Sequence, residues 1–336
     1  EIFLLNTLVI LLNFLTNSQV ETPAIIKFIE NFGIINKINL LVLILFIFAF
    51  LLKTLTTIVI RWKEAKFIYS IKAQISEKFF HGYLNLPFIF HQRTNTSKLL
   101  KNVTFEIDQL VILVFAISTL LLEFIVLTGI SGYLIFFNFK VSTVCIIAFL
   151  AFGYIFNTLN KKKIRTMGKE RIFHQDEKIK SLIEGFTGMR EIKLQSKESN
   201  IIKSFSFHNN LLSKISISTS IRSVIAKPSF EIFMLIIMSI FIIYFIMSDT
   251  LTAAIIPTIG LYLAASYRLV PSIANIVQSV QTIQFNFPCA KILRADIEKF
   301  ERNKINSSNS KIKQLFKETI ELKNLSFSYD QDKSKE

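Results

Sequence analysis

Long apolar runs alternate with long polar runs along the chain. A helix that spans a membrane needs roughly 20 mostly apolar residues, and five runs meet or approach that length. A sixth run, Leu251 to about Ile283, is weaker because polar residues interrupt it. We therefore predict an all-α membrane fold with six transmembrane helices. The five clear runs are Ile2–Leu15, Ile38–Ile60, Leu110–Phe137, Val141–Leu159 and Phe230–Met247.

The polar runs between the predicted spans differ in length and charge. Thr16–Lys37 has two lysines and two glutamates, whereas Arg61–Gln109 has eight basic against four acidic residues, and Asn160–Lys227 has fifteen against six. Lysine and arginine collect on the cytoplasmic side of membrane proteins. We therefore expect an integral protein of a bacterial cytoplasmic (inner) membrane, with both long loops and the C-terminal tail in the cytoplasm.

The two long loops have the pattern of helices. In Asn160–Lys227 apolar residues recur at helical spacing, and no proline precedes Pro228. Folded as two helices of about 34 residues, this loop would reach roughly 50 Å from the membrane at 1.5 Å per residue. The predicted architecture therefore has short outer loops and two long cytoplasmic helical hairpins.

Composition agrees with this interpretation. The chain is 51% hydrophobic, 34 of its 336 residues are phenylalanine, and its mean hydropathy is +0.47. A soluble domain of this size cannot bury so much apolar surface. The net charge of +15 gathers in the predicted cytoplasmic loops, so it indicates topology and contact with lipid headgroups rather than nucleic-acid binding.

Cysteine and histidine give no metal-binding signature. Cys145 and Cys289 lie in largely apolar sequence without metal-ligand spacing, and we expect both to be buried small hydrophobes. The histidines are scattered through the predicted cytoplasmic loops, so we expect surface side chains and no metal site. They are His81, His91, His174 and His208.

The predicted architecture resembles the transmembrane domain of ABC exporters, in which each hairpin ends in a coupling helix that docks on a nucleotide-binding domain. The segment Tyr83–Phe88 with His91–Val103 is similar to the first coupling segment, particularly that of lipid-linked oligosaccharide flippases. Pro87 is expected to break the descending helix. Thr96 or Ser97 is then expected to cap an ascending helix that starts near Lys98.

A second segment, Gly188–Leu194 with Lys197, Glu198 and Phe205, resembles the sequence that leads through the second coupling helix. Its Glu-Ile-Lys-Leu form is again similar to oligosaccharide flippases. A mixed-charge helix of this kind is also typical of an ordinary solvated face. The resemblance implies contact with a nucleotide-binding domain by Arg93, Asn95, Ser97, Glu191, Lys193 and Lys197.

A third segment, Ile320–Tyr329, alternates apolar and polar residues, which is the period of a β-strand. It resembles the first strand of an ABC nucleotide-binding domain, with Tyr329 as the residue that stacks on adenine. The resemblance implies ATP with Mg²⁺ as cofactor and a dimer, which we expect to be a homodimer. No GxxxxGK[ST] phosphate loop occurs in the chain, so we expect the catalytic residues for ATP hydrolysis to lie in a longer parent protein.

The predicted organisation follows from these segments. Residues 1–300 form the transmembrane domain, 301–318 a polar linker, and 319–336 a short β segment that starts a truncated nucleotide-binding domain. The first apolar run opens the chain without a basic segment before it and without a small-residue cleavage site. We therefore expect an N-terminal truncation rather than a signal sequence.

Four ionisable residues interrupt the apolar runs, and such residues are functional candidates because burying a charge in lipid is costly. Arg268 in the sixth run is the leading candidate, since a guanidinium offers planar paired donors to phosphate oxygens. With Lys53 and Glu123 it would line a substrate cavity. The alternative is that Arg268 pairs with Glu123 or Glu231 and ties helices together, and that Lys53 extends to the inner interface.

The sequence therefore favours the membrane subunit of an ATP-driven exporter or flippase that moves an amphipathic substrate by alternating access. Lipid-linked oligosaccharide or another lipid is the first substrate class, and a drug or a peptide is the second. A membrane receptor with a cytoplasmic helical stalk is a more distant alternative, because no heptad pattern follows the last span. A secondary transporter would leave both long hairpins unexplained.

Overall fold

The structure, a computed structural model, describes residues 35–137, 139–247, 255–308 and 324. The described residues are almost entirely helical and contain no strand, which confirms the all-α prediction. Five long helices carry the fold: α3 (Ile35–Leu84), α6 (Ile107–Phe137), α7 (Phe139–Thr187), α9 (Glu198–Met247) and α10 (Ile255–Ser308). Four short elements connect them: α4 (Phe88–Arg93), α5 (Thr96–Lys101), the π-helix η1 (Asn102–Glu106) and α8 (Met189–Leu194).

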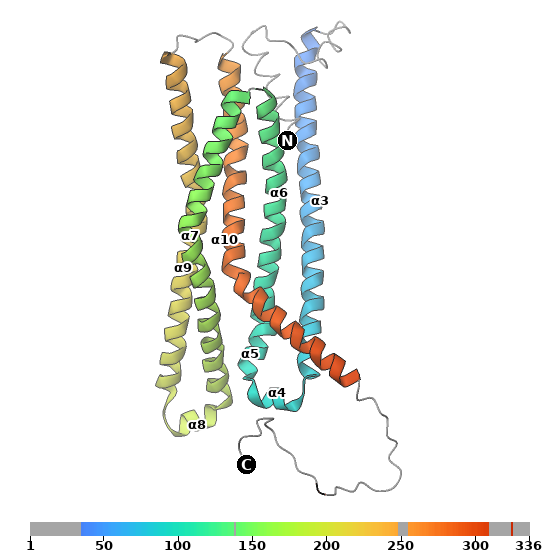
Figure 1. Ribbon diagram of the computed structural model, residues 1–336, viewed down its shortest axis with the longest axis vertical. Helices are drawn as coiled ribbons and strands as arrows, with labels where there is room; N and C mark the ends of the chain where they lie inside the picture. Colours follow the sequence, from blue (N-terminus) through green and yellow to red (C-terminus); the bar gives the residue numbers. More distant parts are fainter. Residues whose placement is uncertain (1–34, 138, 248–254, 309–323, 325–336) are drawn as a thin grey trace.

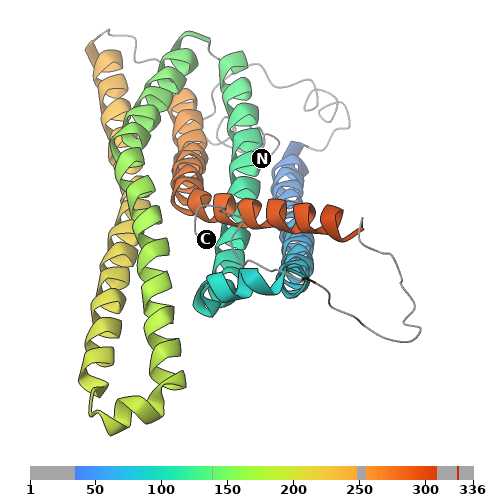
Figure 2. The same ribbon diagram turned by 60° about the horizontal axis from the view of Figure 1, so that its bottom comes forward.

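The long helices run along the long axis of the molecule, and the short elements close two hairpins at one end, which we call the tip end (Figure 1). The first hairpin consists of α3, α4, α5, η1 and α6, and the second consists of α7, α8 and α9. α10 contacts the long helices of both hairpins. Its later part bends away and crosses α6 towards α3 (Figure 2). Pro271 and Pro288 lie inside α10, and a proline within a helix removes a backbone donor and favours such a bend.

Three helical stretches of the described chain are long and apolar enough to cross a membrane: Thr96–Phe136, Ser142–Thr187 and Glu198–Ile240. They overlap three of the six predicted spans, namely Leu110–Phe137, Val141–Leu159 and Phe230–Met247. The predicted span Ile2–Leu15 lies outside the described residues. The number six therefore stays a prediction.

Three buried clusters hold the bundle together, and α10 contributes to each of them. One joins α6 and α10 through Ile130, Leu134, Ala265 and Leu269. Another joins α7, α9 and α10 around Phe149, Phe230 and Val270. The third lies near the tip end, where α3, α6 and α10 meet; it contains Phe79, Tyr83, Ile107 and Leu293. α10 is therefore the central helix of the described fold.

Two closely packed glycines show how tightly helices meet along α10. A Cβ atom on Gly168 of α7 would collide with the backbone carbonyl oxygen of Phe285 on α10. A Cβ atom on Gly82 of α3 would lie 2.7 Å from the Phe300 ring. Backbone cannot move aside as a flexible side chain can, so α7 and α10 can cross this closely only at a glycine.

The C-terminal part of the prediction is tested only at its edges. α10 continues to Ser308, so the first residues of the predicted linker are helical. Most of the predicted strand Ile320–Tyr329, including Tyr329, lies outside the described residues. Asn324 is the one described residue of that strand, and its φ of 52° lies in the left-handed region.

Candidate transport site and coupling segments

A polar cluster lies within the apolar part of α6 and α10. Glu123 of α6 is buried, and its Oε1 accepts a 2.8 Å hydrogen bond from Nδ2 of Asn275 on α10. Nη2 of Arg268 lies 3.8 Å from Oε2 of the same carboxylate, with the Arg268 side chain 33% exposed. The predicted pairing of Arg268 with Glu123 is therefore present, and it joins the two helices.

Asn275 was not among the predicted site residues, although its spacing could have indicated it. Arg268 and Asn275 are seven residues apart on α10, which places them on one face of a helix two turns apart. An amide and a guanidinium on one face, opposite a carboxylate, form a group that can hold an anionic or hydroxyl-rich ligand.

The other two intramembrane charges lie on different helices. Lys53 of α3 is half-buried, and its ammonium lies 5.8 Å from the ring centroid of Phe50 on the same helix. Glu231 of α9 is half exposed and lies 3.9 Å from Lys227, one turn earlier on that helix. Glu231 thus has a partner on its own helix.

At the tip of the first hairpin, α4 forms a short helix without buried residues. Pro87 lies at its N-terminus, so the predicted break after α3 is confirmed. The predicted cap at Thr96 or Ser97 is wrong. Asn95 is the cap, because its side chain accepts a hydrogen bond from the Ser97 backbone N–H at 3.3 Å, and α5 begins at Thr96.

The predicted coupling residues of this segment differ in exposure. Arg93 and Asn95 are exposed at the tip. Ser97 is buried, with only 5% of its surface exposed. Ser97 therefore packs inside the segment, whereas Arg93 and Asn95 can meet a partner.

At the tip of the second hairpin, α8 exposes Glu191 and Lys193, and Lys197 follows it, also exposed. The Lys193 ammonium lies 2.9 Å from Oε1 of Glu198 at the start of α9. This hydrogen bond lowers the pKa of Glu198 below its usual value, helped by a backbone hydrogen bond. Ser196 has a φ of 51° and closes the turn between the two helices. The three predicted charges therefore gather on an exposed tip.

A buried polar junction, which the sequence did not reveal, lies where η1 meets the neighbouring helices. Lys101 and Glu106 are 1% and 0% exposed and lie 3.5 Å apart. Residues five apart come to the same side because a π-helix bonds residue i to residue i+5. Lys101 also lies 2.6 Å from Oδ1 of Asp176, and Arg171 lies 3.1 Å from Oε2 of Glu106. The charged half of the junction thus ties η1 to α7.

The other half of the junction ties η1 to α3 and α10. Asn102, fully buried, donates to the Tyr83 hydroxyl at 3.0 Å and to Oδ2 of Asp296 at 2.9 Å. The Tyr83 hydroxyl donates to the same oxygen at 2.7 Å, and Lys299 lies 2.6 Å from Oδ1. Burial raises the pKa of the Tyr83 hydroxyl, as does Asp296. We define the junction as Tyr83, Lys101, Asn102, Glu106, Arg171, Asp176, Asp296 and Lys299.

Two of the histidines correct the expectation that all four lie singly on the surface. Nδ1 of His174 on α7 lies 3.1 Å from Nδ1 of His208 on α9, and both rings are half-buried. The described residues contain no group of three or more His, Cys, Asp and Glu side chains that could hold a metal. Cys289 is buried as expected, and Cys145 is half-buried.

The chain matches the family of ABC transporter transmembrane regions over residues 2–236. This match covers well over half of the 336 residues. The chain therefore belongs to that family, and the hairpins, their short tip helices and the apolar spans are those of an ABC transporter membrane domain.

Proposed function

We propose that this chain is the membrane part of an ATP-driven exporter or flippase whose substrate is an amphipathic molecule with an anionic headgroup. Lipid-linked oligosaccharide is the first candidate within that class. The observation that carries the proposal is the group formed by Arg268, Glu123 and Asn275 between α6 and α10. A charge inside an apolar span is costly, and one that stays partly exposed beside its partner carboxylate is a candidate for binding a ligand or lining a path through the membrane.

The geometry of this group would let Arg268 exchange the carboxylate of Glu123 for a phosphate of the substrate. At 3.8 Å the contact between Arg268 and Glu123 is an ion pair rather than a hydrogen bond. A phosphate that approached the guanidinium could form shorter, paired hydrogen bonds. Asn275 would keep Glu123 in place while Arg268 turned towards the substrate.

The two hairpin tips are the proposed docking points for nucleotide-binding domains. Arg93 and Asn95 on the first tip, and Glu191, Lys193 and Lys197 on the second, are exposed. ATP with Mg²⁺ would bind to those domains, with its adenine stacked on Tyr329. The full transporter would work as a homodimer. Closure of the domains would move the tips and alternate the access of the transport site between the two sides.

The proposed orientation places the tip end in the cytoplasm. Basic residues cluster where α7 leaves its apolar run, at Lys161, Lys162, Lys163 and Arg165. Such residues next to a span favour the cytoplasmic side. In a bacterium this would be the inner membrane, with the substrate moved from the cytoplasmic to the outer leaflet.

The experiment compares Arg268→Ala with Arg268→Lys in a flipping assay, using full-length protein in proteoliposomes. If the guanidinium binds a phosphate headgroup, Arg268→Ala should lower flipping about tenfold or more, since hydrogen bonds to charged groups contribute about 1.5–3 kcal/mol. Arg268→Lys should retain part of the activity because the charge remains. Full flipping by the alanine variant would contradict the headgroup role.

The same variants separate this proposal from export of a drug or a peptide. Transport of an uncharged amphiphile that is unaffected by Arg268→Ala, together with no flipping of phosphate-bearing lipid by the unmodified protein, would favour a drug exporter. ATP hydrolysis in both variants should stay measurable, because Arg268 meets α6 at Glu123, 17 residues or about 25 Å along the helix from the end of η1 near the tip. Loss of hydrolysis in both would indicate misfolding rather than a binding defect.

A further inference from the structure

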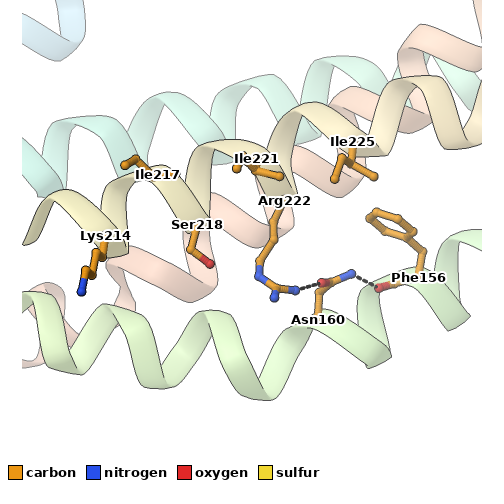
Figure 3. A pocket seen from close by; sticks show the side chains of 8 residues that line it. All are labelled: Phe156, Asn160, Lys214, Ile217, Ser218, Ile221, Arg222 and Ile225. Atoms are coloured by element: carbon orange, nitrogen blue, oxygen red, sulfur yellow. Dashed lines mark hydrogen bonds between the residues drawn. The ribbon is translucent and has the colours of Figure 1, made fainter. Parts of the chain in front are cut away.

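A groove separate from the transport site lies between α7 and α9. It encloses about 400 Å³ and is lined by Phe156 and Asn160 from α7 and by six residues of α9. The α9 residues are Lys214, Ile217, Ser218, Ile221, Arg222 and Ile225. Figure 3 shows Arg222 and Lys214 reaching from α9 towards α7, with Phe156 and Ile225 together at one end. Basic and apolar side chains thus both line the groove, with Arg222 next to its apolar end.

The lining residues of α9 form two stripes. Ile217, Ile221 and Ile225 recur at every fourth position, as do Lys214, Ser218 and Arg222. Residues four apart lie on the same side of a helix, so each stripe follows one edge of the groove. The isoleucines are about half exposed, at 56%, 52% and 47%. An apolar edge beside a basic edge fits an amphiphile that has an acyl chain and an anionic headgroup.

The bonding of Arg222 points to an anion. Its Nη1 donates to Oδ1 of Asn160 at 2.6 Å, and Asn160 in turn donates to the Phe156 carbonyl oxygen at 2.9 Å. Nε of Arg222 is buried and has no hydrogen-bond partner within the described chain. A guanidinium has five donors and carries a full charge, and here its side-chain partner is a neutral amide.

The described residues also place no carboxylate at ion-pair distance from either Arg222 or Lys214. This contrasts with Arg171 and Lys101, each of which meets an acidic partner in the buried junction. Two cations on one edge of a groove, without an internal counter-charge, are complementary to an anion from outside.

The groove lies where a phosphate of the bilayer would lie. On α7 the apolar run ends at Leu159, and Asn160 and three exposed lysines follow directly. On α9 the predicted span begins at Phe230, eight residues from Arg222, which is about 12 Å at 1.5 Å per residue. The headgroup layer is about 5–8 Å deep on each face of the hydrocarbon core. The Arg222 side chain extends from there to Asn160, the first residue after the apolar run of α7, so its guanidinium lies level with the headgroups. Phe156 lies inside that run, level with the start of the acyl chains.

We propose that this groove binds one anionic phospholipid of the cytoplasmic leaflet. Its phosphate meets Arg222 beside Asn160, its headgroup lies against Ser218 on the side towards Lys214, and an acyl chain follows Phe156. The leaflet assignment rests on the orientation given under the proposed function. The transport site lies between α6 and α10, so this lipid is a resident ligand rather than the transported one.

The experiment measures lipid binding by native mass spectrometry of the full-length protein in detergent, titrated with phosphatidylglycerol or with phosphatidylcholine. We expect saturable binding of one phosphatidylglycerol per chain, with much weaker binding of phosphatidylcholine. Arg222→Gln should lower the affinity about tenfold or more, and Arg222→Lys should restore part of it. Lys227→Gln is the matched control. It removes a cation from the same helix and interface outside the groove, and should change the affinity less than twofold or so.

Several outcomes would overturn the proposal. They are equal phosphatidylglycerol affinity for Arg222→Gln and unmodified protein, equal affinity for both lipids, or displacement of the lipid by inorganic phosphate at the same concentration. A disulfide between two chains through Ile221→Cys in a cysteine-free protein would also overturn it, because a second copy would then cover the groove. None of these measurements needs transport or ATP. If the unmodified protein flips its substrate but binds no phosphatidylglycerol, this site alone is refuted. If it binds phosphatidylglycerol but flips no phosphate-bearing lipid, the proposed function alone is refuted.

Discussion

The two hairpins are secured in different ways. Near the tip of the first, Lys101, Asn102 and Glu106 are at most 1% exposed and bind side chains of α3, α7 and α10. At the tip of the second, the ion pair of Lys193 and Glu198 is exposed, with 66% and 37% of the side chains accessible. One hairpin is thus locked into the bundle through buried charges, and the other is closed by contacts at its own surface.

The two hairpins differ in the free energy needed to break their contacts. Removing one partner of a buried ion pair leaves an uncompensated charge in a poorly solvated place, whereas an exposed pair is replaced by water. The distal contacts of the second hairpin join α7 to α9, as in the pair His174 and His208 and the pair Ser181 and Ser204. We infer that the first tip moves as one body with α10 and that the second can bend along its own two arms.

The strongest way to break this comparison is to remove the central charge of the junction. Glu106→Gln should lower the free energy of unfolding by about 3–5 kcal/mol, because Arg171 would lose its carboxylate partner and Lys101 one of its two. Glu198→Gln is the matched control on the second hairpin and should leave the melting temperature unchanged. The measurement is thermal unfolding of the detergent-solubilised protein. Equal melting temperatures for the two variants would show that the hairpins do not differ.

The close contact between Gly168 of α7 and the backbone of α10 offers a second test. Gly168→Ala should lower the free energy of unfolding by about 1–3 kcal/mol, because the new methyl group collides with the carbonyl oxygen of Phe285. Gly132→Ala on α6 is the control, since its methyl group would meet no other atom within 4 Å. It should be neutral or slightly stabilising in a helix. A neutral Gly168→Ala would indicate that α7 and α10 are not held together at this crossing.

Sequence patterning predicted the helical spans and both hairpins because apolar period and loop charge are local signals. The break after α3 was indicated locally by Pro87, whereas a short helix at each tip was expected only from the resemblance to ABC exporters. The predicted N-cap of α5 was wrong by one or two residues. Asn95, Thr96 and Ser97 can all cap a helix, and only packing decides which of them does. Ser97 is buried, and Asn95 accepts the bond.

The junction could not be predicted, because its members are up to about two hundred residues apart and look like ordinary loop charges. Asn102 and Asp296 meet only after α10 has folded across α6. Glu106 reaches Lys101 through a π-helical turn, for which the sequence carries no simple signal. The pairing of Arg268 with Glu123 was foreseen as one of two alternatives, since few carboxylates lie within the apolar runs.

The thiol of Cys289 can report whether the junction is closed. It is fully buried, and burial, with a contribution from Glu106, raises its pKa to about 12. Maleimide reacts with the thiolate, so modification at pH 8 should be very slow in a Cys145→Ser background. Adding Glu106→Gln should increase the rate several-fold or more, because the junction opens and one neighbouring negative charge is lost. An unchanged rate would show that the junction stays closed without Glu106, and Cys289→Ser gives the background signal.

The smallest expected effect concerns the tip of the second hairpin. Lys193 holds the pKa of Glu198 below its usual value through a hydrogen bond, so the ionised side chain contributes stability above the unfolded pKa of about 4.3. That contribution is lost as the pH falls through the lowered folded pKa. Lys193→Gln should therefore raise the pKa of Glu198 towards its usual value, as measured by ¹³C NMR titration of the labelled carboxyl group. Because the pair is exposed, the melting temperature near neutral pH should not change measurably. A clear loss of thermal stability would mean that this tip is held as firmly as the first hairpin, and the contrast between a locked hairpin and a bending one would not stand.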